Sequence, residues 1–334
     1  MSDPNTAAAT GVVARWNRFW HGEGNTLSLG IFRALFAACL IWEIPVTRAK
    51  SLFGIEGGFH FPYVPFITPL PAPLYHAIHD WQYPFAIMLL LGVFPRIAGA
   101  ALLILQGYVF FSDQLNFRNH PYFFLLILLF FVVFPSGQSF SIQSLWNRLR
   151  RSREKVAAAV GAIAPLTAQQ LIKFQISVVY FYAAVHKMTE QYLGGFVLSD
   201  QMSRMMFRGR SGRMLQDMLS PATLESFKTT VADPGFWVIP AWTTVILEVT
   251  LPFVLWIPRW RVAGMIFGIG FHISIAYVMN IDIFSAAMIA SYLLFLDPET
   301  VPRVWLKART RLAGRTATKV ARTGKPKSAV RSPR

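Results

Sequence analysis

Polar and ionisable side chains interrupt the long apolar stretches of this chain at four places, and these residues are the ones that could carry chemistry. An ionisable side chain in an apolar stretch loses hydration, so it is normally either paired or functional. The four clusters are Asn116-Phe117-Arg118-Asn119-His120-Pro121-Tyr122, Tyr180-Phe181-Tyr182-Ala183-Ala184-Val185-His186-Lys187, Glu248, and Phe271-His272 followed by Tyr277, Met279, Asn280 and Asp282.

Lys187 is the strongest candidate for a base. An ammonium group held between apolar walls loses hydration, which favours the neutral amine, and a neutral amine can remove a proton from a substrate. The alternative is that Lys187 ends a helix and extends its charged group to the membrane interface, as many lysines do. The sequence of this segment alone leaves both interpretations open.

The histidines have structural explanations as well as catalytic ones. His120 follows Asn119 at an expected helix start, where capping and interface hydrogen bonds explain it about as well as catalysis does. His186 directly precedes Lys187, so its side chain is expected to point about 100° away around the helix. His272 has apolar neighbours on both sides and must be hydrogen-bonded, for which a structural partner is sufficient.

Glu248 is expected to form a structural ion pair with Arg33, because both are charged residues within apolar stretches. No metal site is expected. His76 and His79 are spaced like a ligand pair, but no His-x-x-x-His or Glu-x-x-His pattern lies in any apolar stretch. Cys39 is the single cysteine, so a disulfide framework and a cysteine-based metal site are excluded.

The composition is that of a membrane protein. Of the 334 residues, 54% are hydrophobic and only 14% are charged, whereas an average soluble domain has about 25% charged residues. With 29 Phe, 10 Trp and 10 Tyr, the chain is too rich in aromatic residues for intrinsic disorder. We therefore expect an integral membrane protein, with the lipid bilayer as its main partner.

Eight apolar stretches are long enough to be considered as membrane-spanning helices, which require about 20 residues. They cover residues 27–47, 74–94, 96–113, 121–137, 168–188, 236–257, 261–279 and 281–297. The predicted fold is an all-α, polytopic bundle with one transmembrane domain (27–298), an N-terminal cytoplasmic segment (1–26) and a C-terminal tail (299–334). The connection 189–235 is expected to be a long loop.

The formal net charge of +16 belongs largely to the tail. Residues 301–334 contain eleven Lys or Arg and no acid. We expect this tail to be disordered and cytoplasmic, because basic residues favour that side of the membrane and bind anionic lipid there. An even number of crossings also makes the N-terminus cytoplasmic, and a bacterial inner membrane fits this orientation. No nucleic-acid partner is expected.

The order and spacing of the polar clusters resemble the transmembrane domain of the vitamin K-dependent γ-glutamyl carboxylases and, more widely, of the HTTM (horizontally transferred transmembrane) domain proteins. The resemblance extends from about Leu27 to Pro298. It rests on Asn119-His120-x-Tyr122, Val179-Tyr180-Phe181-x-Ala183 with Lys187 and Tyr192-x-x-Gly195, Glu248 followed by Phe271-His272, Phe59-His60-Phe61-Pro62-Tyr63, and Ser291-Tyr292-Leu293-Leu294-Phe295.

The resemblance implies a quinone-linked lyase of the carboxylase type. In that family a lysine at the position of Lys187 is regarded as the base that deprotonates vitamin K hydroquinone, and a histidine at the position of His120 lies beside the reacting groups. The quinol anion reacts with oxygen, the product removes the γ-proton of a peptide glutamate, and carbon dioxide adds to the carbanion. Reduced quinone, oxygen and carbon dioxide are thus the implied co-substrates, and a peptide or protein glutamate is the implied acceptor.

The implied quinone pocket lies in the half of the bilayer opposite the cytoplasm. A dry pocket of this kind would protect an oxygenated intermediate from water. Besides Lys187 and His120, its expected lining residues are Asn119, Tyr122, Tyr180, His186 and His272.

This chain also departs from the family pattern. The family typically has two adjacent lysines where this chain has His186-Lys187, and a tryptophan where it has Tyr192. The animal carboxylases continue into a large lumenal domain, for which we find no counterpart after Pro298. The resemblance therefore supports the membrane-embedded chemistry more directly than glutamate carboxylation. The alternatives are a non-catalytic scaffold subunit of a membrane complex and a transporter of a small molecule or lipid.

Overall fold

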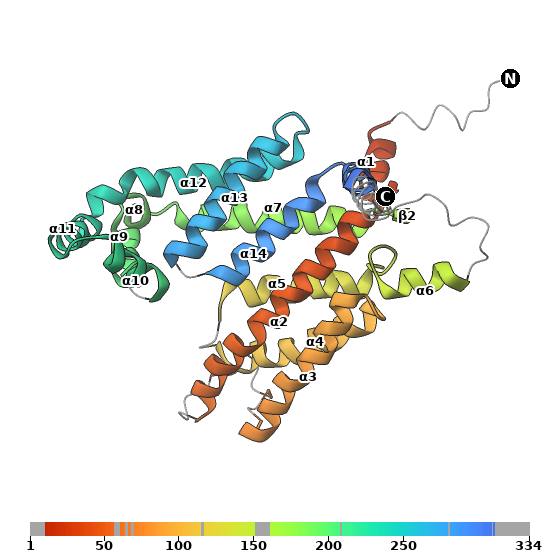
Figure 1. Ribbon diagram of the computed structural model, residues 1–334, viewed down its shortest axis with the longest axis horizontal. Helices are drawn as coiled ribbons and strands as arrows, with labels where there is room; N and C mark the ends of the chain where they lie inside the picture. Colours follow the sequence, from red (N-terminus) through yellow and green to blue (C-terminus); the bar gives the residue numbers. More distant parts are fainter. Residues whose placement is uncertain are drawn as a thin grey trace, which may run out of the picture.

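Helices form most of the chain, as its long apolar runs predict (Figure 1). The computed structural model describes residues 11–56, 61–63, 66–67, 70–114, 117–150, 161–207, 209–279, 281–308 and 310. In chain order its elements are α1 (Val12–His21), β1 (Glu23–Asn25), α2 (Leu27–Glu56), α3 (Ala72–Leu91), α4 (Pro95–Ser112), α5 (Asn119–Val133), α6 (Ile142–Arg150), β2 (Ile163–Pro165), α7 (Thr167–Lys187), α8 (Glu190–Leu193), α9 (Phe196–Met205), α10 (Gly209–Met218), α11 (Pro221–Ala232), α12 (Pro234–Trp256), α13 (Arg261–Met279), α14 (Asp282–Ser291) and the 3-10 helix η4 (Tyr292–Phe295).

A helix occupies each of the predicted spans, and the protein is a helical membrane protein. Within the described residues, four helical segments are long and apolar enough to cross a membrane: Leu27–Ala49 of α2, and the whole of α4, α12 and α13. Helix α5 and the α14–η4 segment are apolar but shorter. Helices α3 and α7 have 20 and 21 residues, but polar side chains such as Gln82 and Lys173 interrupt their apolar character. A total of eight crossings therefore stays a prediction.

Two tight connections lie where the sequence predicts helical hairpins. Helix α3 ends at Leu91 and is followed by Gly92, whose φ of +68° is the left-handed conformation that favours glycine, and Pro95 begins α4. A side chain at Gly92 would meet the Arg33 guanidinium and the Ser141 side chain. The second connection separates α12, which ends at Trp256, from α13.

Helix α2 runs through the main bundle and packs against α3 and α14, while α4 packs against α3 and α5. Helix α7 packs against α12, and α13 packs against both α12 and α14. The rings of Phe124 and Phe131 on α5 meet Phe36 of α2 edge to face, with centroids 5.2 and 5.8 Å apart. These contacts fix α5 against α2 and so position the polar residues at the start of α5.

The connection 189–235 differs from its prediction as a long loop. The structure has four short helices there, α8 to α11. Their apolar side chains form a separate small core with α12, built on Leu198, Met202, Val231 and Trp237. The apolar residues of this segment recur in short groups that Gly194-Gly195, the arginines 204–213 and Ser220-Pro221 separate, so the sequence does not show the continuous periodicity of a long helix.

Two three-residue strands add a small antiparallel sheet to the predicted all-helical fold. Glu23 pairs with Pro165 and Asn25 pairs with Ile163, so the sheet joins the starts of α2 and α7. The expectation of a disordered tail is also wrong in part, because residues 300–308 are helical. Residues 311–334 lie outside the described residues, as do Phe59, His60, Asn116 and Asn280.

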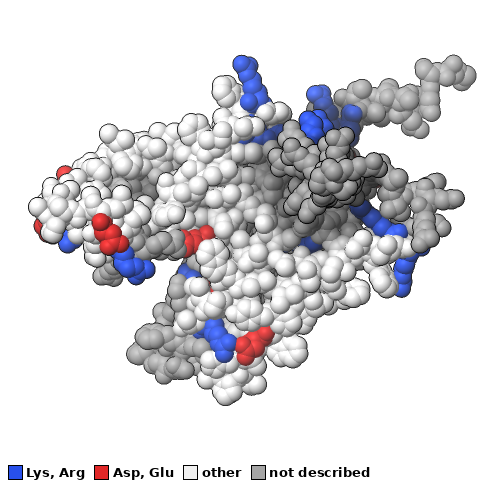
Figure 2. Space-filling view, viewed as in Figure 1, with Lys and Arg blue, Asp and Glu red and all other residues white. Residues whose placement is uncertain are grey.

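Charged side chains gather towards the ends of the molecule and leave a broad uncharged band between them (Figure 2). At one end, α1 and α6 carry four arginines and no acid. At the opposite end acids and bases are mixed, as in the ion pairs Arg204–Asp200 on α9 and Lys228–Glu225 on α11. This distribution is typical of a protein that crosses a membrane.

Candidate functional site

Lys187 and Glu248 form a two-point ion pair between the end of α7 and the middle of α12. The Lys187 Nζ lies 2.6 Å from Oε1 and 2.7 Å from Oε2 of Glu248. The Glu248 side chain is 5% exposed and the Lys187 side chain 28% exposed. Lys187 is thus held by a counter-ion and not between apolar walls alone.

Tyr192 on α8 lies beside this ion pair, with the Lys187 Nζ 6.0 Å from its ring centroid. The Thr189 hydroxyl accepts a hydrogen bond from the Tyr192 backbone N–H and caps α8. Gly195 then turns the chain with a φ of +83°, where a side chain would collide with the Pro234 carbonyl. Burial raises the pKa of Tyr192 to about 12, so its hydroxyl stays protonated at neutral pH.

A second polar group, which we call the buried trio, consists of Tyr180, His272 and Tyr292. The Tyr180 Oη lies 2.6 Å from the His272 Nε2 and is also hydrogen-bonded to the Tyr292 Oη. All three side chains are buried, and they join α7, α13 and η4. Gly268 on α13 makes room for the Tyr292 phenol, because any side chain there would collide with it.

A third polar group lies where α2 meets the start of α5. Oε1 of the buried Glu43 is 3.5 Å from the Arg118 Nη1 and 3.5 Å from the His120 Nε2, and it accepts a 2.9 Å hydrogen bond from Thr47. The Arg118 Nη1 also lies 3.1 Å from the His120 Nε2. The His120 Nε2 therefore lies between a donor, the Arg118 guanidinium, and an acceptor, the Glu43 carboxylate.

Phe284 of α14 lies between the second and third groups. Its ring centroid is 6.3 Å from that of His120 and 6.1 Å from that of His272. Among the contacts of the described residues, none joins His120 to Lys187 directly. The residues predicted as a single pocket therefore form separate polar groups, two of which share an aromatic neighbour.

Three predicted pocket residues do not join these groups. Asn119 and Tyr122 are exposed on α5, where the Tyr122 ring contacts Phe110, with centroids 6.2 Å apart. His186 is exposed on α7 and packs edge-on against Tyr182, with centroids 4.2 Å apart. His186 therefore points away from Lys187, as the helical geometry predicts.

The predicted ion pair between Arg33 and Glu248 is wrong. The fully buried Arg33 donates hydrogen bonds to the backbone carbonyls of Leu89, Ser136 and Phe140, at 3.0, 2.7 and 2.5 Å. These carbonyls lie at the end of α3 and in the turn after α5, where helix ends leave acceptors unsatisfied. The Glu248 carboxylate instead binds Lys187.

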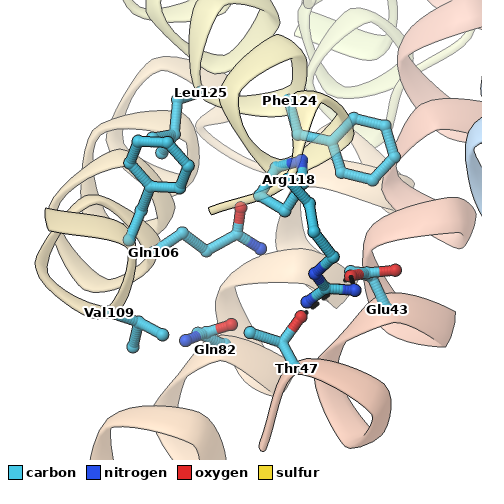
Figure 3. A pocket seen from close by; sticks show the side chains of 10 residues that line it. Glu43, Thr47, Gln82, Gln106, Val109, Arg118, Phe124 and Leu125 are labelled. Atoms are coloured by element: carbon cyan, nitrogen blue, oxygen red, sulfur yellow. Dashed lines mark hydrogen bonds and ion pairs between the residues drawn. The ribbon is translucent and has the colours of Figure 1, made fainter. Parts of the chain in front are cut away.

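A pocket among α2, α3, α4 and α5 is lined in part by Glu43, Thr47 and Arg118 of the third polar group (Figure 3). None of the predicted site residues lines it. Three residues of the observed groups were missing from the predicted site, Glu43, Arg118 and Tyr292. Glu43 is an acid within an apolar stretch, the signal that identified Glu248, and Tyr292 lies in the Ser291-Tyr292 motif.

The buried trio has one feature that fits a bound organic group. The His272 Nδ1 is buried and has no hydrogen-bond partner among the described residues, although buried polar atoms normally have one. A hydrogen-bonding group of a bound molecule would provide this partner. Within the described part of the chain, no three His, Cys, Asp or Glu side chains group as they would around a metal ion.

Comparison with protein families gives a match over most of the chain. Residues 23–299 match the family described as the HTTM domain, which covers most of the chain and all three polar groups. No solved structure matches the chain.

Proposed function

The chain belongs to the HTTM domain family, whose domain it shares with vitamin K-dependent γ-carboxylase, and on that premise we propose that it is a membrane-embedded enzyme that uses a reduced quinone. Lys187, acting together with Glu248, is the proposed base. His120 is the proposed residue that polarises a reacting oxygen. Carboxylation of a peptide glutamate, with carbon dioxide, is the reaction that the family suggests.

The Lys187–Glu248 ion pair is the observation that carries this proposal. The free energy needed to remove two charges from water often exceeds the free energy gained from their contact. Apolar residues at the same positions often give equal or greater stability. Stability alone therefore gives little reason for this pair. A role in proton transfer gives a reason for a buried carboxylate that binds a lysine through both oxygens.

The paired carboxylate determines how Lys187 would act as a base. In the charged pair the Nζ has no free lone pair. When the shared proton moves from Nζ to a Glu248 oxygen, 2.6 or 2.7 Å away, the neutral amine can accept a proton from a substrate hydroxyl. After this transfer Lys187 and Glu248 together hold one additional proton. Release of that proton would return the pair to its charged state.

The other polar groups would position the substrate. His120 contacts Arg118 and Glu43 through Nε2, so Nδ1 is the ring nitrogen that would face a substrate oxygen. The buried trio offers the unpartnered His272 Nδ1 as a second polar contact. A bound hydroquinone would supply the two electrons for the reaction with oxygen. The aromatic ring of Phe284, between His120 and His272, would contact its apolar ring system.

The proposed topology has eight crossings with both termini in the cytoplasm, as in a bacterial inner membrane. It is supported by a helix in each predicted span and by the arginines of α1 and α6 at one end. In this orientation Lys187 and His120 face away from the cytoplasm.

A scaffold function is the second candidate, because the same ion pair could simply tie α7 to α12. The two functions make different predictions for Lys187→Arg. Arginine can keep the ion pair but cannot act as a base, since it is not deprotonated in proteins. A scaffold should therefore tolerate Lys187→Arg, whereas the proposed enzyme should not.

The test uses the full-length protein in phosphatidylcholine nanodiscs, supplied with vitamin K hydroquinone, oxygen and bicarbonate. Oxygen uptake and quinone epoxide formation are measured for the wild type, Lys187→Arg and Lys187→Ala. We expect both variants to lose activity by at least about 100-fold, in line with the usual contribution of a general base. Lys228→Arg, at the exposed ion pair on α11, is the matched control and should keep full activity.

Two results would contradict the proposal. Wild-type protein that consumes no oxygen with any reduced naphthoquinone or benzoquinone tested would favour the scaffold. Oxygen consumption that Lys187→Arg leaves unchanged would remove Lys187 as the base while leaving quinone use intact.

A further inference from the structure

The pocket among α2, α3, α4 and α5 has a lining that suits a ligand of its own (Figure 3). The space among its lining side chains has a volume of about 490 Å³ when the part open to the surroundings is included. Its polar lining residues are Glu43, Thr47, Gln82, Gln106 and Arg118. It shares no residue with the Lys187–Glu248 ion pair or with the buried trio.

Gln82 is the residue that points to a ligand. Its side chain lies on α3, is 2% exposed and lines the pocket. Its amide Nε2 is buried and has no hydrogen-bond partner among the described residues. A buried amide donor of this kind is normally satisfied in native proteins, so a missing partner calls for an explanation. A ligand oxygen in the pocket would provide that partner.

Gln106 on α4 presents a second carboxamide to the same pocket, on the side of Arg118 (Figure 3). A carboxamide both donates and accepts hydrogen bonds, so Gln82 and Gln106 together suit a ligand with hydroxyl or carbonyl oxygens. The Glu43 contacts with Thr47, Arg118 and His120 all use Oε1, which leaves acceptor capacity at Oε2 for a ligand hydroxyl.

The charges of the pocket favour an uncharged ligand. The Glu43 carboxylate is already compensated by Arg118, 3.5 Å away. An ionised ligand would bring an additional charge into a mostly enclosed site without a counter-ion, which is unfavourable. The rest of the lining is apolar and partly aromatic, and it consists of Val109, Phe110, Pro121, Phe124 and Leu125.

We propose that this pocket binds an uncharged, lipid-soluble molecule whose head carries hydroxyl groups. The Gln82 Nε2 donates to one head-group oxygen, Glu43 accepts from a head-group hydroxyl, and the Phe110 and Phe124 side chains contact the apolar part. Two sources provide this chemistry, the head of a quinol and the glycerol head of a neutral lipid. The proposal does not depend on Lys187 acting as a base.

The test uses photoreactive diazirine analogues of a naphthoquinol and of 1-monooleoylglycerol with full-length protein in phosphatidylcholine nanodiscs. Crosslinked peptides are identified by mass spectrometry with and without excess unmodified competitor. We expect one analogue to label α4 or α5 in a competitor-sensitive manner, at least ten-fold less in Gln82→Leu. Gln143→Leu, at an exposed carboxamide on α6, should label like the wild type.

The thermal stability of Gln82→Leu separates loss of binding from loss of folding. Leucine has a similar size and removes a donor that lacks a protein partner, so the ligand-free variant should be at least as stable as the wild type. The excess ligand should raise the melting temperature of the wild type but not that of the variant.

Labelling by the quinol analogue alone would identify a quinol site, and labelling by the glyceride analogue alone a neutral-lipid site. The proposal is overturned if neither analogue labels α4 or α5 competitively, or if Gln82→Leu and Gln106→Leu both leave the labelling unchanged. Either result is independent of whether Lys187→Arg abolishes oxygen uptake.

Discussion

The Glu248 carboxylate on α12 binds the Lys187 ammonium at the end of α7 through both of its oxygens. Residues 61 positions apart in the chain are thereby joined at one point of the bundle. Because α7 also contributes Tyr180 to the buried trio, this one helix carries parts of two of the three polar groups.

Removing one partner of this ion pair should destabilise the protein more than removing both. We expect Lys187→Met to cost about 3 kcal/mol, the lower end of the range for buried pairs, because Lys187 is 28% exposed. The double variant Lys187→Met/Glu248→Leu should return to within about 1 kcal/mol of the wild type, since it leaves no unpaired charge. The free energy of unfolding of these three proteins is measured in detergent micelles.

The same double variant also separates stability from catalysis. If the pair is only structural, the stable double variant should behave like the wild type in every functional assay. Loss of oxygen uptake in a stable double variant would match the proposed function instead.

Gly268 and Gly270 on α13 provide a matched test of the buried trio. A methyl group at Gly268 would lie 2.7 Å from Cζ of Tyr292, whereas nothing lies within 4 Å of one at Gly270. Gly268→Ala should therefore lower the melting temperature, because the Tyr292 ring must move. Gly270→Ala should be neutral or stabilising by up to about 1 kcal/mol, from the better helix propensity of alanine. Equal effects of the two substitutions would show that Tyr292 does not pack on Gly268.

Arg33→Met should destabilise the protein by about 3 kcal/mol or more, because it leaves three backbone carbonyls in a buried site without their donor. The structure separates Arg33 from Glu248, so this effect should add to that of Glu248→Gln within about 0.5 kcal/mol. Strongly non-additive effects in the double variant would instead support the predicted Arg33–Glu248 ion pair.

Cysteine labelling in intact cells tests the proposed topology. Arg150→Cys, on α6, should be protected from a membrane-impermeant maleimide, and Asp217→Cys, on α10, should react with it. Both side chains are exposed, whereas the native Cys39 is buried, so the wild type provides the unlabelled control. Labelling of Arg150→Cys rather than Asp217→Cys would reverse the orientation.

The sequence predicts the helices of the bundle well because a long apolar run has few alternatives in a membrane. The hairpins at Gly92 and after Trp256 were predictable for the same reason, since proline and arginine interrupt the apolar character there. The helices of residues 189–235 were not predictable, because the formation of short amphipathic helices depends on the surface against which they pack.

Partner choice was the part of the site that the sequence did not determine. Arg33, Lys187 and Glu248 are all recognisable as charged residues in or near apolar stretches, but which of them meet depends on helix rotation and depth. Arg33 lies where α3 and the turn after α5 expose their carbonyls, and a donor in that position needs no acid. Tertiary contacts of this kind have no local sequence signature.

The hydrogen bonds of Arg33 also bear on how the protein is made. The carbonyl of Phe140 lies 107 residues further along the chain, so α2 emerges from the ribosome long before this acceptor has been synthesised. Until then the guanidinium of the first span must be solvated by water or by the insertion machinery. We therefore expect the nascent α2 to remain beside the translocation channel and to enter the lipid only together with α3, α4 and α5.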